Sequence, residues 1–283
     1  MTKLLAAGFS RLWKTKTFWL AAAFMFGAAA FAVITQYKYS LEDGYEIAMN
    51  SFVFGFTLII GILAAVFSNF FIGTEYSDGT IRNKLIVGHK RPAVYCSNLI
   101  ITITAALLIS AAYLIALFAI GTPLIGFIDF TTTSVMDFIA LSLGSIIMVC
   151  SVCAVLTAVN MLISNKAIAA IVCILSMVVL LVISVEVSAR LDEPELHSGV
   201  YMLIDGELVP QEELRPNPRY LKGMSRVVYE YLRDVLPTGQ ALQYANIGMG
   251  VEHPWWLLPL YSLAIAALST LIGVLFFQRK DIK

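Results

Sequence analysis

Cysteine is the residue type in this sequence with the clearest chemical spacing. Cys150 and Cys153 form a CxxC pair, which on a soluble loop is typical of zinc binding or thiol redox chemistry. Here the pair stands alone inside a long apolar run, so we interpret it as a packing feature. Cys96 and Cys173 also fall in or at apolar runs, and this excludes a structural disulfide within the polar segment 188–254.

Signatures of hydrolytic enzymes are missing from the sequence. The histidines are far apart and lack the HExxH spacing of a metal hydrolase. Gly121 and Gly126 have the spacing of a phosphate loop, but Phe127 follows where a lysine is needed. The chain has neither a Walker A sequence nor a GxSxG elbow, so we expect no catalytic residue, metal or cofactor in it. The three histidines are His89, His197 and His253.

A charged stretch between two apolar runs is the remaining candidate site. Glu75 and Asp78 are spaced to share one face of a short helix; Gly79 permits a bend, and Thr80 can cap the next turn. An acidic group followed by a basic group suits docking onto a charged partner. The alternative is a solvated loop that its positive charges keep inside the cell. The basic residues are Arg82, Lys84, Lys90 and Arg91.

The elements around this stretch are membrane spans. Hydrophobic residues make up 59% of the 283-residue chain and charged residues 13%, whereas a soluble domain is near half apolar and a quarter charged. A helix needs about 20 apolar residues to cross about 30 Å of hydrocarbon. Six runs meet that length, and they predict an all-α integral membrane protein with six transmembrane helices. The runs are 17–36, 51–72, 97–120, 136–163, 167–187 and 255–277.

The span interiors are almost free of charge. Asp137 and Glu186 fall at span ends, where a charge reaches the headgroups, and Asn160 is the one strongly polar side chain deep in the fourth run. Ion-driven pumps normally carry buried carboxylates, so this pattern disfavours a secondary transporter. The fourth and fifth runs are separated by 164–166 alone, which predicts a tight helical hairpin. The first run is too long for a signal peptide and is interpreted as a retained span.

The basic residues predict the orientation. Twelve of the 19 lie on one side of a six-span arrangement, in the N-terminal segment, the loop after the second span, the hairpin turn and the tail. Short cytoplasmic loops are enriched in lysine and arginine, so both termini are expected in the cytoplasm of a plasma-membrane protein. Trp19, Trp255 and Trp256 lie at span ends, as in an interfacial aromatic belt.

The long segment 188–254 is expected outside the cell as a small α+β unit. Val200–Ile204 and 207–209 flank Asp205-Gly206, which predicts a β-hairpin. Asn217 and Pro218 suit a helix start, and Pro237 and Gly239 are expected to end that helix. The helix can lie on the outer membrane surface, cap the spans, or gate a substrate. Its predicted apolar face consists of Leu221, Met224, Val228, Tyr231, Leu232 and Val235.

The charged stretch resembles the signature of type-2 ATP-binding-cassette (ABC) transporter permeases. In that family the second span runs into a cytoplasmic segment with a glutamate, then Gly-Thr-Ile/Leu, a leucine and an arginine before the third span. The stretch 217–243 also resembles permeases common in Gram-positive bacteria. The matching positions are Glu75, Gly79, Thr80, Ile81, Leu85 and Arg91.

The resemblance implies a division of the chain and a set of coupling residues. Residues 1–187 hold an N-terminal interfacial helix and five spans, 188–254 form the extracellular segment, and 255–283 hold the last span and tail. The loop 73–92 would couple the chain to a cytoplasmic ATPase. The implied coupling residues are Glu75, Tyr76, Asp78, Gly79, Thr80, Ile81, Arg82, Lys84, Leu85 and Arg91. Those of the interfacial helix are Leu5, Arg11, Leu12, Trp13 and Lys14.

The implied function is movement of a substrate by ATP hydrolysis in separate subunits. The chain would pair with a second permease copy or a sister permease and with two cytoplasmic ATPases, which bind ATP and Mg²⁺, in a lipid membrane and without nucleic acid. Export of an antimicrobial peptide, drug or lipid-like molecule is typical of the family. The rival hypothesis is a membrane scaffold or sensor that binds a ligand through 188–254 and moves nothing. An intramembrane enzyme is a further alternative without a visible catalytic pair.

Overall fold

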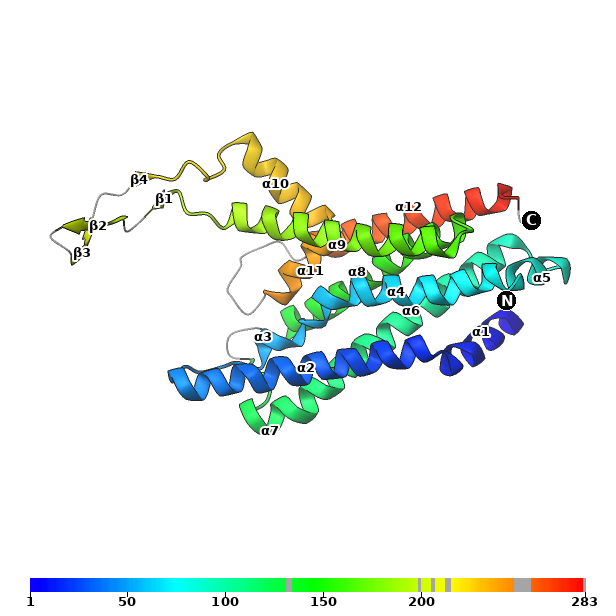
Figure 1. Cartoon of the computed structure of the whole chain (residues 1–283), viewed down its shortest axis with the longest axis horizontal. Helices are drawn as coiled ribbons and strands as arrows, with labels where there is room; N and C mark the ends of the chain where they lie inside the picture. Colours follow the sequence, from blue (N-terminus) through cyan, green and yellow to red (C-terminus); the bar gives the residue numbers. More distant parts are fainter. Residues whose placement is uncertain (131–133, 198–199, 205–206, 212–214, 247–255, 282–283) are drawn as a thin grey trace.

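Six long apolar helical segments lie side by side along the long axis of the molecule (Figure 1). The computed structural model describes residues 1–130, 134–197, 200–204, 207–211, 215–246 and 256–281. Each segment has the length and hydropathy to cross a bilayer, so the six predicted spans are confirmed. They are α2 (Lys16–Asp43), α3 with α4 (Asn50–Val53, Phe56–Ser77), α6 with η1 and α7 (Arg91–Ala116, Leu117–Gly121, Thr122–Ile125), α8 (Val135–Leu162), α9 (Lys166–Leu191) and α12 (Leu257–Arg279).

Some spans continue beyond the apolar runs that predict them. The first span runs through Lys38 and Glu42 to Asp43, so the first half of the expected loop 37–50 is helical. Lysine and glutamate are good helix formers, and the helix stops only where Gly44 adopts a left-handed conformation with φ of 72°. The third span likewise extends at both ends and contains the π-helical turn η1.

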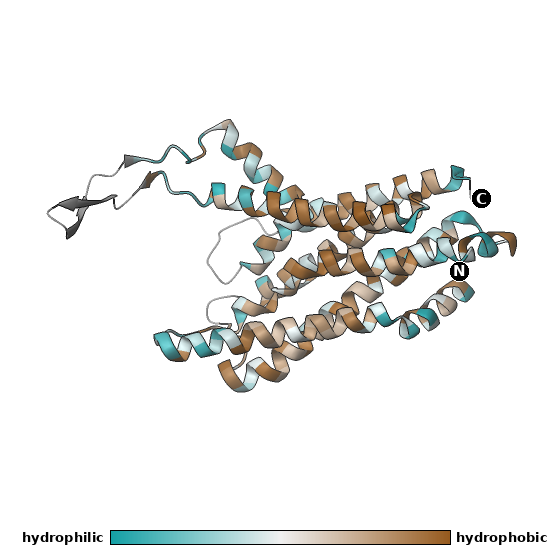
Figure 2. Cartoon of the chain, viewed as in Figure 1, coloured by the Kyte–Doolittle hydropathy of each residue, from teal (hydrophilic) through white to brown (hydrophobic). Residues whose placement is uncertain are grey.

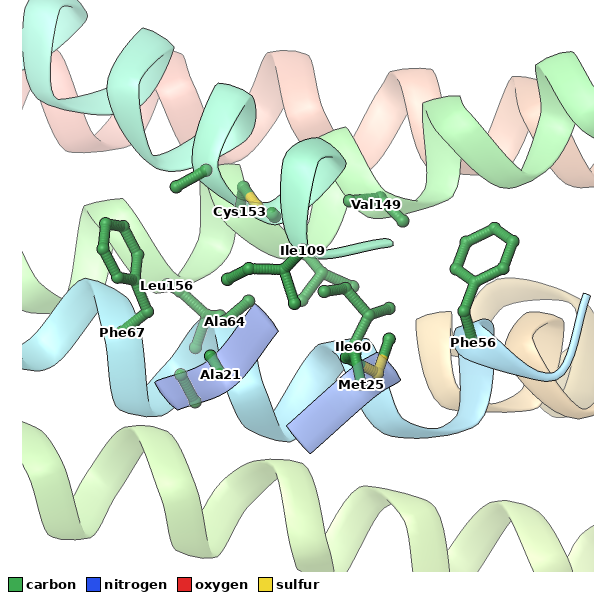
Figure 3. Close-up of a cluster of buried hydrophobic side chains, with 14 of the residues drawn as sticks. Ala21, Met25, Phe56, Ile60, Ala64, Phe67, Ile109, Val149, Cys153 and Leu156 are labelled. Atoms are coloured by element: carbon green, nitrogen blue, oxygen red, sulfur yellow. The ribbon is translucent and has the colours of Figure 1, made fainter. Parts of the chain in front are cut away.

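Helices α4 and α8 form the inside of the bundle. Helix α4 packs against α2, α6, α8 and α9, and α8 packs against α12 and α6. Figure 3 shows their facing side chains, with Phe56, Ile60 and Ala64 of α4 near Val149 and Cys153 of α8. Figure 2 shows hydrophobic residues along the middle of the bundle and hydrophilic residues toward its ends. Large apolar side chains on the outside of α9 are exposed, as lipid contact requires.

The hairpin between α8 and α9 is as tight as the sequence predicts. Helix α8 ends at Leu162 and α9 begins at Lys166. Asn165 caps α9, because its side-chain oxygen accepts hydrogen bonds from the backbone N–H groups of Ala167 at 2.9 Å and Ile168 at 3.2 Å.

Two short antiparallel ladders extend beyond α9 at the end of the molecule opposite both termini (Figure 1). Strand β1 (Leu196–His197) pairs with β4 (Arg215–Pro216). Strand β2 (Val200–Ile204) pairs with β3 (Glu207–Gln211), with Val200 opposite Gln211 and Ile204 opposite Glu207. The turn expected at Asp205-Gly206 and the interfacial position expected for Trp255 lie outside the described residues.

The helix expected from Asn217 begins later than predicted. Asn217 instead closes a turn, where its side-chain oxygen accepts from the N–H of Arg219 at 2.8 Å, and α10 (Met224–Val235) begins after Gly223. Helix α10 packs against α9 and α12, and the ring of Tyr231 contacts that of Tyr261 in α12, with 6.0 Å between the centroids. Most of the predicted apolar face is nevertheless exposed, with Met224 77% and Tyr231 57% exposed. The helix therefore contacts the spans with only part of its predicted apolar face.

A second short helix is buried against the bundle. Pro237 does not only end α10; it begins α11 (Pro237–Ala245), as proline can at a first helical position. Helix α11 packs against α4, α8 and α9, and most of its side chains are buried. Thr57 of α4 donates to the carbonyl of Ala241 at 2.8 Å, and Ser262 of α12 donates to the side-chain oxygen of Gln240 at 2.5 Å.

Candidate functional site

Glu75 is a buried carboxylate at the centre of the end that carries both termini. Its side chain is 2% exposed. One oxygen pairs with the Arg11 guanidinium at 2.8 Å and with the Lys84 ammonium; the other accepts from the Asn98 side-chain amide at 3.0 Å. These partners come from α1 (Thr2–Lys14), α5 (Thr80–Ile86) and α6, so one carboxylate joins four helices. A buried charge requires such pairing, since it loses its hydration.

The local backbone explains how Glu75 and Lys84 meet. Glu75 belongs to the last turns of α4, which continues without a break from the second span; the separate short helix expected here is not formed. Gly79 has φ of 68°, a conformation that glycine adopts without steric cost, and it reverses the chain into α5. Ile81 is 1% exposed and anchors α5 to the bundle. Thr80 makes no side-chain cap, because Gly79 occupies the cap position.

The acidic pair predicted from Glu75 and Asp78 does not form one surface. Glu75 is buried, whereas Asp78 is exposed at the C-cap of α4. Residues three apart share a face only while the helix continues, and α4 ends between them. Glu75 therefore positions helices and leaves the outer surface of the loop to other residues.

Helix α1 lies along α6, with Gly8 against the side chain of Ile101. Leu4, Gly8 and Leu12 form its buried face. A Cβ atom added to Gly8 would lie 2.0 Å from Cδ1 of Ile101, so glycine allows the close approach. Arg11 stacks on the Phe71 ring with its guanidinium carbon 3.6 Å from the centroid, and burial lowers the pKa of Arg11 while Glu75 opposes that shift.

The remaining residues of the predicted interfacial helix differ in exposure. Leu5 is half-buried, Trp13 is 51% exposed, and Lys14 is exposed. The backbone carbonyl of Trp13 accepts from the Trp19 indole N–H at 2.9 Å, which ties the end of α1 to the start of α2.

The C-terminal end of α12 is fastened to the same region. One Arg91 nitrogen donates to the carbonyls of Phe277 at 3.2 Å and Gln278 at 3.0 Å, and also to that of Lys280. A cationic side chain at the free carbonyls of a helix end also complements the helix dipole. Arg91 therefore secures the last span to the start of α6.

Lys280, directly after α12, forms a second set of hydrogen bonds to neighbouring helices. Its ammonium donates to the Tyr76 hydroxyl at 2.9 Å and to the Met161 carbonyl at 2.9 Å, and the Tyr76 hydroxyl donates to that same carbonyl. The ammonium also lies 4.2 Å from the centroid of the Tyr76 ring. The ends of α4, α8 and α12 thus share one polar contact.

The Lys280 contact predicts a pH-dependent stability. Burial lowers the pKa of Lys280 from 10.5 to about 8. Between these values the unfolded chain binds more protons than the folded chain, so the free energy of unfolding rises with pH. We expect the Tm of the wild type, relative to Lys280→Met, to rise from pH 8 toward pH 10.5 in thermal unfolding of the purified chain in detergent. The exposed Arg279→Gln serves as control, and a pH-independent difference for Lys280→Met contradicts the prediction.

The outer surface of this end is basic and apolar. Arg82 and Lys90 are exposed, and between them Ile86 and Val87 are 70% and 78% exposed. Leu85 is half-buried and faces the bundle. Two neighbouring aliphatic side chains at a helix tip, with cations around them, suit a partner surface with an apolar pocket and acidic rim.

Sequence reasoning missed three polar residues of this region. Asn98 and Lys280 complete the contacts of Glu75 and Tyr76, and Asn69 donates to the Asn160 side chain at 3.1 Å. An asparagine within an apolar span is itself a signal, because an amide in hydrocarbon needs a partner. The predicted residues Arg11, Glu75 and Lys84 do meet, although the sequence places them in separate elements.

The described residues contain no group of three or more histidine, cysteine or carboxylate side chains arranged to hold a metal ion. Cys153 is buried in α8, and all four cysteines are free thiols. Around Glu75, one carboxylate joins α1, α4, α5 and α6.

Comparison with known proteins agrees with the layout. The model of the family described as ABC-2 family transporter protein matches residues 4–185, which cover most of α1, the first four spans and most of the fifth. No curated protein matches the chain. Because the family match covers well over half of the sequence, this multi-pass membrane protein belongs to the ABC-2 family of transporter proteins.

Proposed function

We propose that this chain is the permease subunit of an ABC transporter and that separate cytoplasmic ATPase subunits dock on α5 and the residues after it. The observation that carries the proposal is the Glu75 junction. It fixes α5 and α1 to α4 and α6, while Ile86 and Val87 remain exposed for a partner. The family match supports the permease class.

The junction gives a physical route from ATPase to spans. Movement of a docked ATPase would push α5, and the buried pairing of Lys84 with Glu75 would pass that displacement to α4. Helix α4 packs against four other spans, so its displacement changes the bundle as a whole. A partner shifts the equilibrium between two arrangements of the spans only if it binds those two arrangements with different affinity. The docking surface must therefore be linked rigidly to the spans, so that it differs between the two arrangements.

The proposed orientation places both termini and α5 in the cytoplasm and 188–254 outside. It rests on the twelve basic residues at one end and on the even number of spans. The exposed apolar face of α10 would then lie in the outer headgroup layer. In this proposal the chain has three parts: residues 1–187 with five spans, the extracellular segment 188–254, and residues 255–283 with the last span and the cytoplasmic tail.

We propose export of an amphipathic peptide, drug or lipid-like molecule, through a complex with a second permease. We propose that α11 closes the bundle in this conformation. A cavity of about 20 Å³ beneath α11 is lined mainly by apolar side chains, including Leu58, Met148 and Met177. Its polar lining residues are Thr57 of α4 and Thr238 of α11. That volume suits about one water molecule, so transport requires α11 or the spans to move.

The test is recovery of the tagged chain from its native membranes in mild detergent, followed by mass spectrometry. We expect a near-stoichiometric soluble protein with a Walker A sequence. Val87→Asp should abolish its recovery, because a charge on a 78% exposed apolar residue opposes docking without disturbing the core. Gly79→Val should weaken it and lower coupled ATPase activity, since a β-branched residue disfavours the φ of 68° that orients α5.

Leu196→Asp is the matched control, because it adds the same charge to an exposed leucine in β1, at the opposite end of the molecule. It should leave recovery of the ATPase unchanged. A clean preparation without any ATPase, under conditions that preserve a known complex of this kind, would favour the scaffold or sensor hypothesis. Full recovery by Val87→Asp would reject α5 as the docking element.

A further inference from the structure

Helix α12 is held to the rest of the bundle at its two ends. Its buried residues are Leu258 and Ser262 in the first turns and Gly273 and Phe277 in the last turns. The residues between these two pairs are half-buried or exposed. Figure 1 shows α12 running from the region of α10 and α11 toward the end of the molecule that carries both termini. A rigid helix fixed in this way can carry movement from one end of the bundle to the other.

The inner end of α12 is joined to the last residues of the loop 73–92 and the first turns of α6. Arg91 donates to the carbonyls of Phe277 at 3.2 Å and Gln278 at 3.0 Å. One turn further along α6, Tyr95 lies so close to Gly273 that a Cβ atom there would be 2.2 Å from the tyrosine hydroxyl oxygen. The rings of Tyr95 and Phe277 have centroids 6.4 Å apart. Displacement of Arg91 with the loop would therefore displace the end of α12.

The outer end of α12 is joined to α10 and α11. Ser262 and Gln240 are both 0% exposed, and the serine hydroxyl donates to the side-chain oxygen of Gln240 at 2.5 Å. The Gln240 amide nitrogen donates in turn to the carbonyl of Asp234 at 2.7 Å. The rings of Tyr231 in α10 and Tyr261 in α12 have centroids 6.0 Å apart. A buried amide that loses a partner costs free energy, so α11 is expected to follow α12 when it moves.

We infer that α12 transmits displacement of the loop 73–92 to α11, with Arg91 and Ser262 as the positioning residues at its two ends. About 22 Å of helix separate Ser262 from Phe277, so the two ends do not act by direct contact. Helix α12 packs mainly on α8, and also on α6 and α10, so Arg91 gives the loop a connection that does not pass through α4. The inference rests on the proposed function, in which α5 receives the ATPase and α11 closes the bundle.

The test is the labelling rate of a cysteine beneath α11, measured in the purified chain in detergent without any ATPase. Ala241→Cys places a thiol at a position that is 4% exposed and lines the cavity there, so a polar maleimide reaches it only when α11 moves. The rate is measured relative to the chain without the added cysteine. Arg91→Ala and Ser262→Ala should each raise it about tenfold, because each removes a hydrogen bond that holds one end of α12.

The double variant decides whether the two effects share one route. Substitutions this far apart normally act independently, so two tenfold effects would multiply to about a hundredfold. If α12 joins them, Arg91→Ala combined with Ser262→Ala should label at about the rate of the single variants. A helix that is detached at one end no longer holds what is attached at the other. Multiplied effects overturn the inference.

Ile81→Ala is the matched control for a general loss of packing at the inner end. Ile81 is 1% exposed and belongs to α5, which packs on α4 and α6. This variant should lower the Tm and leave the labelling rate at position 241 unchanged. Arg91→Lys, which keeps a donor for the same carbonyls, should label at nearly the wild-type rate. A rise for Ile81→Ala as large as that for Arg91→Ala would indicate general loosening and would overturn the inference.

Gly273→Ala provides a second inner variant if Arg91→Ala does not fold, because the added Cβ atom would push α12 away from Tyr95. It should raise the labelling rate and should not multiply with Ser262→Ala. The measurement separates this inference from the proposed function. Absence of any ATPase from native membranes would reject the proposed function and leave the labelling result unchanged. Multiplied effects in a chain that does bind an ATPase would reject transmission through α12 alone.

Discussion

Replacement of Glu75 by alanine is expected to destabilise the purified chain by about 3 kcal/mol, because it leaves the cations of Arg11 and Lys84 partly buried without their anion. Asn98 loses its acceptor at the same time. The Arg11 side chain is 32% exposed, so water partly solvates its charge. We therefore expect the loss in free energy of unfolding to lie at the lower end of the range for breaking a buried ion pair. Membrane insertion should be unaffected, since the apolar spans are unchanged.

The functional consequence of Glu75→Ala should exceed that of removing the neighbouring exposed carboxylate of Asp78. Release of α5 and α1 from α4 should strongly lower transport and coupled ATPase activity even where the chain remains folded. Asp78→Ala is the matched control, because it removes an exposed carboxylate three residues away. It should change stability by less than about 0.5 kcal/mol. Thermal unfolding in detergent and ATPase assays of the reconstituted complex measure both effects; similar losses for the two variants would contradict the role assigned to Glu75.

Replacement of Gly239 by alanine is expected to displace α11 from the bundle. A Cβ atom there would lie 2.2 Å from the backbone oxygen of Arg233 and 3.0 Å from its carbonyl carbon. Backbone atoms cannot turn aside as a flexible side chain can, so the two helices must separate. Overpacking of this kind costs about 1–3 kcal/mol, and the hydrogen bond from Thr57 to the carbonyl of Ala241 should be lost with it.

Gly27→Ala is the matched control for Gly239→Ala. Gly27 lies within α2, and a Cβ atom there meets no heavy atom within 4 Å. Alanine in place of glycine in a helix should leave the Tm equal or raise it. Thermal unfolding in detergent compares the two variants. If α11 closes the bundle as proposed, Gly239→Ala should also alter transport, and an unchanged Tm for Gly239→Ala would show that α10 and α11 separate without cost.

The sequence by itself determined the membrane class and the number of spans. Run length and hydropathy suffice for this, because every backbone group in hydrocarbon must be satisfied within its own helix. The hairpin at 164–166 followed from the same argument, since the two adjoining runs together are too long for one span. The family was predicted from the short match around Glu75 and Gly79, and the family comparison confirms the family. These features depend on local sequence, and so they were predictable.

Only the tertiary structure decided which residues meet. Arg11 and Lys280 lie near opposite ends of the chain, yet both reach the end of α4, because six antiparallel spans return the chain repeatedly to the same side. Glu75 and Asp78 look equivalent in sequence, but the end of α4 between them buries one and exposes the other. Sequence pattern likewise did not decide burial in 224–245, because the amphipathic pattern identified α10, whereas α11 is the helix that is mostly buried. Periodicity shows that a face is apolar, whereas the packing of distant helices decides whether that face is buried against protein or exposed.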